Sequence, residues 1–264
     1  MTTLMQSFPT RGLGMEKVSA IIPVVAMGLF LSAGLAAQAQ DSVGVATNAA
    51  GEKYLVDAKG MSLYYYTKDK TGDSDCNGNC IKAWPAFYAA NLTVSPPLDP
   101  ADFGTIRRSD NSMQTTYKGW PLYYWVRDKN PGDMTGEGVG KVWYILKVPA
   151  YTVMISTDKT LGNYLVDGKG MTLYWFAKDT PGKGEGSGGS VANWPAFAPD
   201  SFVVPSALDP ADFRMVVRGD GTKQATYKGY PLYYFVKDEK RGDIVGQDVK
   251  NVWFVIDPEK FPAK

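Results

Sequence analysis

Residues 63–69 have the sequence LYYYTKD, and nearly the same string returns as LYYWVRD (122–128), LYWFAKD (173–179) and LYYFVKD (232–238). Aromatic and β-branched residues at this density favour β-strands. Successive side chains of a strand point to opposite faces, and in these strings both faces are apolar. The four strings therefore predict four related strands that are covered on both sides.

The surroundings of these strings contain a duplication without gaps. YLVDAKGMSLYYYTKD begins at Tyr54, and YLVDGKGMTLYWFAKD begins at Tyr164, 110 positions later. The same offset relates WPAF (84–87 and 194–197) and LDPADF (98–103 and 208–213). A weaker pattern, K-G-x-[SPT]-L-Y, starts at Lys59, Lys118, Lys169 and Lys228, so each half contains two related quarters.

Turn residues punctuate the strands. Asp110-Asn111 and Asp220-Gly221 suit tight hairpins with positive φ. Short helical turns are expected near Ala83-Trp84 and at Asp99-Pro100, where aspartate can cap and proline can occupy the first helical position. No long stretch after the N-terminal region has a helical period, so the pattern favours antiparallel β-structure throughout.

The predicted fold class is all-β, with two tandem homologous antiparallel β domains that are sandwich-like or barrel-like. The domains are expected at 40–148 and 149–264, and each is itself a duplication. The alternative is a four-blade propeller-like ring with one blade from each quarter.

The N-terminus is predicted to be a signal peptide over residues 1–39. A sparse positive region precedes an apolar stretch, 18–37, and Ala37-Gln38-Ala39 places small residues at a cleavage site. Met15 is a possible alternative start to Met1. A retained membrane anchor is the competing interpretation, because the apolar stretch is long enough to span a bilayer.

Charge and composition exclude several classes of function. Removal of residues 1–39 leaves a chain with no net charge, which offers no electrostatic basis for nucleic-acid binding. The chain has no histidine, which excludes Ser-His-Asp and Cys-His catalysis and most zinc and copper sites. We expect no cofactor, and we expect that the protein is not an enzyme.

The two cysteines, Cys76 and Cys80, lie in the loop DCNGNC. A cysteine pair in an exported chain usually oxidises, and both cysteines are missing together from the second half, where Gly186 and Ser190 replace them. We predict an intramolecular disulfide. A metal or redox role, and a bridge between molecules, are the alternatives.

Carboxylate pairs beside glycines suggest loops that could bind calcium, which takes several oxygen ligands. The third quarter breaks this pattern, because Lys183 follows Asp179. The competing interpretation is that each motif aspartate caps a turn by accepting backbone N–H bonds. A glycosidase carboxylate pair is a further alternative. The candidate calcium ligands are Asp69, Asp73, Asp128, Asp133, Asp238 and Asp243.

Within the four strings, some positions vary and others do not. The third ring changes freely, which indicates packing rather than a bonding hydroxyl (Tyr66, Trp125, Phe176 and Phe235). The first tyrosine and the closing aspartate are constant, and we expect a buried hydroxyl and a turn cap (Tyr64, Tyr123, Tyr174, Tyr233, Asp69, Asp128, Asp179 and Asp238).

Two surface features remain as candidates. Trp120 and Tyr230 precede the PLYY strands, and we expect these rings to be exposed, which would suit stacking on carbohydrate. Asn91-Leu92-Thr93 is a possible N-glycosylation site.

The motif Y-x-[FWY]-x-x-D, repeated four times, together with a cysteine-containing loop before Trp84-Pro85, resembles the secreted-repeat family of unknown function. The resemblance covers nearly the whole chain after the signal. It implies an exported protein, and similar repeats in archaeal surface proteins imply an envelope role. The lipid-attachment cysteine of lipoprotein members is absent here.

The leading hypothesis is a non-enzymatic exported protein of the cell envelope, at the cell surface or extracellular. It would be a structural or assembly component of a surface layer or sheath, with itself and other envelope components as partners. The alternative is an extracellular binding module for polysaccharide or calcium.

Overall fold

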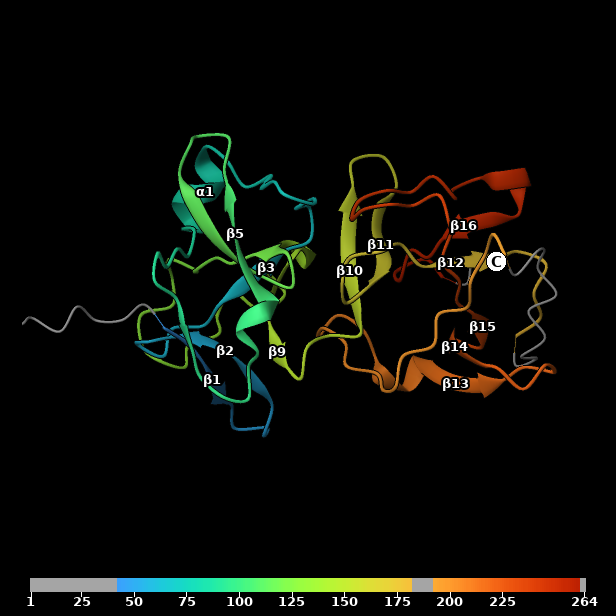
Figure 1. The fold of residues 1–264 in the computed structure, drawn as a ribbon, viewed down its shortest axis with the longest axis horizontal. Helices are drawn as coiled ribbons and strands as arrows, with labels where there is room; N and C mark the ends of the chain where they lie inside the picture. The colour runs from blue at the N-terminus through green and yellow to red at the C-terminus, as the bar shows by residue number, and fades with distance from the viewer. Residues whose placement is uncertain (1–41, 182–191, 262–264) are drawn as a thin grey trace, which may run out of the picture. The chain divides into compact units, whose positions relative to one another are not determined.

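The computed structural model describes residues 42–181 and 192–261 (Figure 1). The predicted signal peptide, 1–39, lies outside the described residues. The strands are β1 (Ser42–Thr47), β2 (Lys53–Asp57), β3 (Tyr64–Tyr66), β4 (Thr93–Val94), β5 (Phe103–Arg107), β6 (Met113–Tyr117), β7 (Trp120–Pro121), β8 (Trp143–Ile145), β9 (Lys147–Val148), β10 (Val153–Asp158), β11 (Gly162–Asp167), β12 (Tyr174–Phe176), β13 (Phe213–Val217), β14 (Lys223–Tyr227), β15 (Tyr230–Pro231) and β16 (Trp253–Val255). The helical elements of the described residues are α1 (Asn79–Ala83) and the 3₁₀ turns η1 (Pro100–Asp102), η2 (Val139–Lys141), η3 (Pro210–Asp212) and η4 (Val249–Asn251).

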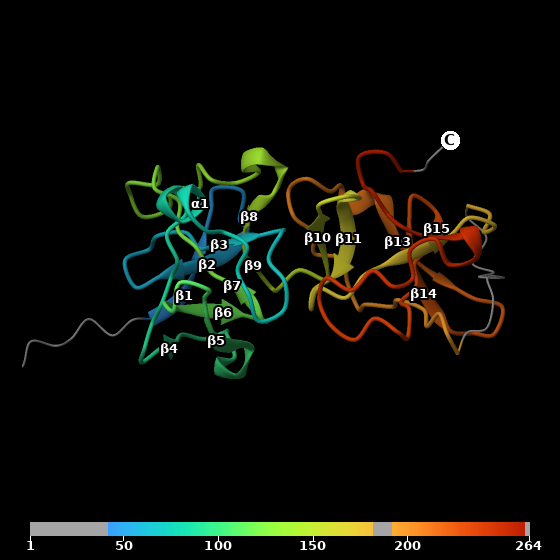
Figure 2. The ribbon, with the colours of Figure 1, turned by 90° about the horizontal axis from the view of Figure 1, so that it is seen from above.

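The described strands form six sheets, in the orders β4-β1-β2-β9, β3-β8, β5-β6-β7, β10-β11, β12-β16 and β13-β14-β15. Every paired neighbour is antiparallel except β1 and β4, which run parallel. The β10–β11 hairpin is clear in both ribbon views (Figures 1 and 2). The all-β, largely antiparallel prediction is confirmed.

The two quarters of each half share strands. β3 belongs to the first quarter and pairs with β8 of the second, and Tyr64 also bridges to Tyr123. β12 and β16 pair in the same way in the second half. A propeller-like ring would keep each quarter in its own blade, so this interleaving is evidence against the alternative fold. The predicted boundary, 148–149, falls between β9 and β10, and no sheet of the described residues crosses it.

Local side-chain bonds explain where the hairpins turn. Asp57 ends β2, and its Oδ1 accepts the N–H groups of Lys59 at 2.8 Å and Met61 at 2.9 Å. Gly60 completes this turn with a φ of 80°, a conformation that glycine adopts without steric cost. The turn between β5 and β6 places Asn111 at a φ of 69°, as the hairpin prediction requires.

The two predicted helical turns are present. α1 ends at Ala83, directly before Trp84. Asp99 precedes η1, and its Oδ1 accepts the N–H of Ala101 at 2.9 Å, with Pro100 at the first position. Asp209 repeats this cap at the start of η3.

A continuous apolar core joins the two halves, which belong to one compact unit. It includes Leu55 and Tyr65 of the first half together with Ile155 and Leu165 of the second. Two smaller clusters surround Trp84 and Trp194, one in each half. The duplication therefore builds two similar sets of sheets on a shared core.

Arg241 fixes the second half to the first. Its guanidinium donates to the carbonyl of Gly119 at 2.6 Å and to that of Lys118 at 3.0 Å. The same group lies 3.8 Å from the centre of the Trp120 ring, a cation–π contact. Burial lowers the pKa of Arg241 to about 10, so the side chain stays charged at neutral pH.

Candidate functional site

The motif tyrosines and aspartates of the first half bind each other across the two quarters. Tyr64 donates from its hydroxyl to Asp128 Oδ2 at 2.7 Å. Tyr123 donates in return to Asp69 Oδ2, also at 2.7 Å. All four side chains are buried. We call this reciprocal pairing the tyrosine–aspartate exchange.

The second half contains the same exchange. Tyr174 donates to Asp238 Oδ2 at 2.6 Å, and Tyr233 donates to Asp179 Oδ2 at 2.9 Å. Paired tyrosine and aspartate are 64 or 54 positions apart in both halves. The constant positions of the four strings are therefore each other's partners, which the sequence alone left open.

In three of the four motif aspartates, the second carboxylate oxygen orders the loop that follows the strand. Asp69 Oδ1 accepts the N–H of Asp75, Asp128 Oδ1 accepts that of Thr135, and Asp238 Oδ1 accepts that of Val245, each at 2.9 Å. Each of these aspartates thus binds a tyrosine of the other quarter and a loop of the quarter to which the aspartate belongs. Accepting a backbone N–H is the capping role that the sequence predicts for these aspartates.

Burial changes the acidity of these groups. Desolvation raises the pKa of Asp69 to about 8, although the hydrogen bonds from Tyr123 and from the Asp75 N–H act in the opposite direction. Burial is also the main cause that raises the pKa of Asp238 and of Tyr64 and Tyr123. The tyrosines are therefore neutral donors at every physiological pH.

A third tyrosine–aspartate bond accompanies the exchange in each half. Tyr124 donates to Asp57 Oδ2 at 2.9 Å, and Tyr234 donates to Asp167 Oδ2 at the same distance. The sequence prediction did not identify these pairs. The signal was present, because both pairs keep the offset of 110.

In the first half, a polar network links the exchange to the cysteine loop. Arg108 is buried and donates to Ser74 Oγ at 2.7 Å, and Ser74 Oγ lies 2.6 Å from the Tyr123 hydroxyl. Arg108 also donates to the carbonyl of Cys76. Cys76 and Cys80 form an intramolecular disulfide, as predicted. The disulfide loop is thus held against the buried end of the exchange.

Four aromatic rings follow one another in a row beside each exchange, all stacked in the first half and with one tilted contact, Phe176 on Trp253, in the second. In the first half, neighbouring ring centres are 4.2, 3.9 and 4.1 Å apart along Tyr66, Trp143, Trp84 and Trp125. In the second half, the corresponding distances are 4.6, 3.7 and 4.3 Å along Phe176, Trp253, Trp194 and Phe235. The exchangeable third ring of each motif therefore forms one end of a row, where any flat ring can stack.

The proposed calcium loops use their carboxylates for another purpose. Asp133 Oδ2 accepts the N–H groups of Lys129 at 2.8 Å and Asn130 at 2.9 Å. Asp243 closes its own loop in the same way, and Asp73 Oδ1 accepts the N–H of Ser74. Within residues 42–181 and 192–261, no group of three or more acidic or cysteine residues is placed to hold a metal ion. The geometry gives the calcium hypothesis no support.

The predicted exposure of Trp120 is wrong. Only 1% of Trp120 is exposed, because Arg241 and the second half cover the ring. Tyr230, its counterpart, is half-buried and packs 5.5 Å from the Trp175 ring. Asn91 is exposed just before β4, and its glycosylation stays a prediction.

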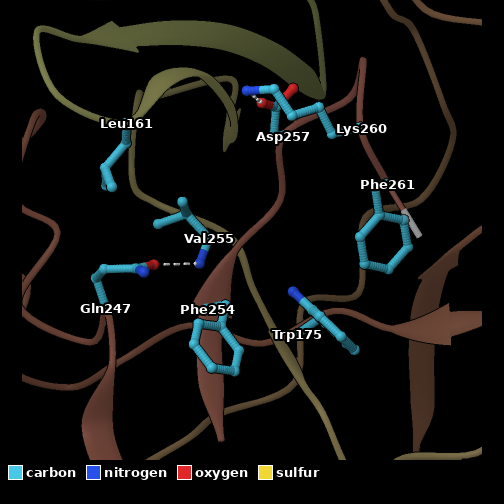
Figure 3. Close-up of a pocket in the computed structure, with 8 residues that line it drawn as sticks. All are labelled: Leu161, Trp175, Gln247, Phe254, Val255, Asp257, Lys260 and Phe261. Carbon is cyan, nitrogen blue, oxygen red and sulfur yellow. Dashed lines mark hydrogen bonds and ion pairs between the residues drawn. The ribbon is translucent and has the colours of Figure 1, made fainter. Parts of the chain in front are cut away.

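The second half carries an apolar hollow of about 400 Å³. Its walls include the rings of Trp175, Phe254 and Phe261 (Figure 3). At the rim, Lys260 Nζ pairs with Asp257 Oδ2 at 2.6 Å. The sequence did not predict this site, because Trp175 and Phe254 belong to the same repeated strands as the core and Phe261 lies in a segment without a motif.

Comparison of the sequence with known protein families assigns the chain to a family. The model described as "secreted repeat of unknown function" matches residues 44–87, 104–147, 156–198 and 214–257, one match for each quarter. These matches cover more than half of the chain, and the protein belongs to this family. No curated protein and no solved structure matches the chain significantly.

The family assignment makes this an exported protein, as the N-terminal sequence predicts. Among the helices of the described residues, none is long and apolar enough to cross a membrane. The predicted fourfold repeat and the family resemblance are both confirmed.

Proposed function

We propose that this exported protein is a non-enzymatic component of the cell envelope, a structural or assembly unit of a surface layer or sheath. The tyrosine–aspartate exchange carries the proposal. The side chains that are constant in all four quarters are buried, and they bond to one another. The repetition therefore serves the framework of the molecule rather than four copies of an open site.

The state of the reactive groups supports a role without catalysis. A general acid or base must reach the substrate proton, and a nucleophile needs an adjacent base. The motif hydroxyls donate to carboxylates inside the protein, and three of those carboxylates also accept backbone N–H groups. Groups that are committed in this way stabilise the fold and have no access to a substrate.

Assembly is compatible with the surface properties of the chain. Repeated β modules can extend through their edge strands unless those edges are blocked. Without residues 1–39 the chain has no net charge, so little long-range repulsion opposes close packing. Its partners would be further copies of itself and other envelope components.

Sedimentation velocity over a wide range of protein concentration tests this proposal, together with electron microscopy of the assembled material. We expect regular assemblies, and we expect the native protein to fractionate with the insoluble envelope. A protein that stays monomeric at every concentration, salt level and divalent-ion level would contradict the proposed role.

The apolar hollow favours a second candidate, the binding of polysaccharide. Trp175 and Phe254 offer ring faces for a sugar, and Asp257 and Lys260 offer polar groups at the rim. Calorimetry with envelope glycans would detect such binding. The same titration with calcium addresses the other predicted ligand, which no observation on the described residues favours.

A further inference from the structure

The first half has a face that the second half covers, which we call the docking face. It consists of Tyr65, Tyr144 and Ile145, which are 0%, 1% and 3% exposed. Tyr65 lies beside the backbone of Ile155, and Ser206 contacts the Glu137 carboxylate next to this face. The covering residues come from β10 and from the segment 203–208 of the second half.

The second half has its own docking face at the same positions, and the described residues cover it only in part, because the buried Phe261 ring packs 5.0 Å from the Trp175 ring at one side of it. Trp175, Phe254 and Val255 replace the three first-half residues, and all three are half-buried. The apolar hollow lies between them (Figure 3). Gln247 Oε1 accepts the N–H of Val255 at 2.8 Å, as Glu137 Oε2 accepts that of Ile145 at 2.6 Å. The two docking faces therefore have the same backbone hydrogen bonds, but only the face on the first half is covered completely.

The covering surface also exists in both halves, and we call it the inserting face. In the second half it is formed by 153–157 and 203–208, and in the first half by 43–47 and 93–98. In the second half, Ile155 and Ser156 are buried against the first half. Their counterparts, Val45 and Ala46, are half-buried, and Thr47 is exposed.

A backbone hydrogen bond at the internal contact can be repeated by a second copy. Thr157 donates its N–H to the carbonyl of Thr67 at 2.9 Å. Thr157 pairs with Asn163 in its hairpin as Thr47 pairs with Lys53, so the N–H of Thr47 points outward in the same way. The counterpart of Thr67 in the second half is Ala177. Thr67 donates its N–H to the carbonyl of Val142, and Ala177 donates its N–H to the carbonyl of Val252 in the same way.

We infer that the docking face of the second half binds the inserting face of the first half of another copy. The inference deepens the proposed function and rests on it. Because the two surfaces are different, the contact is heterologous and leaves one free surface at each end of every complex. Repetition of such contacts produces an open chain of molecules, or a ring where the rotation closes.

Two positions predict that this contact is weaker than the internal one. The hydroxyls of Thr67 and Thr157 lie 2.6 Å apart at the internal contact, and Ala177, the counterpart of Thr67, has no hydroxyl. Arg241 clamps the second half onto the turn at Gly119, whereas its counterpart in the first half is Pro131. An incoming copy therefore lacks the guanidinium bonds and the cation–π contact. Assembly should depend on protein concentration, while the contact within one chain does not.

Four variants of the full exported chain test the inference. Phe254→Glu places a charge in the docking face, and Val217→Glu is its control, because Val217 is 67% exposed on β13 of the same half. Thr47→Pro removes the outward N–H of the inserting face, and Thr47→Val keeps it. Unchanged thermal unfolding and near-ultraviolet circular dichroism establish that each variant is folded.

In sedimentation velocity, we expect the wild type and both controls to form species larger than dimers as concentration rises. Phe254→Glu and Thr47→Pro should each weaken association by about tenfold or more, because each removes one surface of the contact. A mixture of these two variants should form dimers and nothing larger, because one intact surface of each kind remains.

Other results would overturn the inference. If both variants assemble like the wild type, the surfaces are wrong, although the proposed structural role stands. If the mixture fails to form dimers, the contact is not head-to-tail. If the wild type remains monomeric, the proposed function and the inference fail together. If glycan binding is measured for the wild type and is lost in Phe254→Glu, the hollow is a polysaccharide site instead.

Discussion

The two halves of this protein have the same internal bonds but different neighbours. Both contain the tyrosine–aspartate exchange, with bonds of 2.6–2.9 Å, and both contain a row of four aromatic rings in contact. The first half alone has a disulfide in the described residues, and its docking face is covered. The features that both halves share stabilise the fold of each half, whereas the features in which they differ concern the contact between halves.

Removal of a central ring should break both halves to a similar extent. Trp84 and Trp194 stack on both sides in their rows and are almost completely buried. We expect Trp84→Ala and Trp194→Ala each to lower the free energy of unfolding by about 3–5 kcal/mol, through lost burial and a cavity. Denaturant titration measures this loss. Tyr88→Ala, at an exposed ring, is the control, and equal losses at Tyr88 and Trp84 would contradict the interpretation.

Removal of one hydroxyl from the exchange should have the next largest effect. Tyr64→Phe and Tyr174→Phe each leave a buried carboxylate oxygen without its donor, which costs about 1–3 kcal/mol of stability. Tyr66→Phe is the matched control, because it copies Phe176 of the other half. Thermal and denaturant unfolding measure all three. A loss at Tyr66 as large as that at Tyr64 would mean that the exchange is not the stabilising feature.

The disulfide sharpens the comparison, since the second half lacks both cysteines. Cys76→Ala together with Cys80→Ala should lower stability by about 2 kcal/mol, because the closed loop is short. Unfolding of the wild type in the presence of a reducing agent should show the same loss. Identical unfolding curves with and without the reductant would show that the Arg108 network holds this loop without the disulfide.

Taken per unit of pH, the change in unfolding free energy that the Asp69 carboxyl causes is the smallest of the four effects. The folded pKa of Asp69, about 8, lies above that of an exposed aspartate, so the folded state binds the proton more tightly. This contribution to stability is complete below about pH 4 and is lost as the pH rises to about 8, by at most about 1.4 kcal/mol per unit. The difference in unfolding free energy between the wild type and Asp69→Asn should follow this window. A difference that is constant with pH would contradict the raised pKa.

Much of the architecture follows from local pattern. Strand positions, the turn at Asn111 and the cap at Asp99 depend on neighbouring residues, so propensity and turn chemistry predict them. The disulfide followed from its spacing and its absence from the second half. The exposure of Trp120 was not predictable in this way, because Arg241 covers it from 121 positions away.

The sequence by itself determined that the chain is a fourfold β-repeat, that its first tyrosine and last aspartate are fixed positions, and that its cysteines pair. Periodicity and internal repetition carry this information, since they describe each segment and its copies. Only the tertiary structure decided that each tyrosine binds the aspartate of the other quarter, and that one docking face is buried while the described residues cover its counterpart only in part. Those facts depend on which distant segments are in contact. The two halves have nearly the same local sequence, so local sequence cannot reveal why one docking face is buried and the other is not.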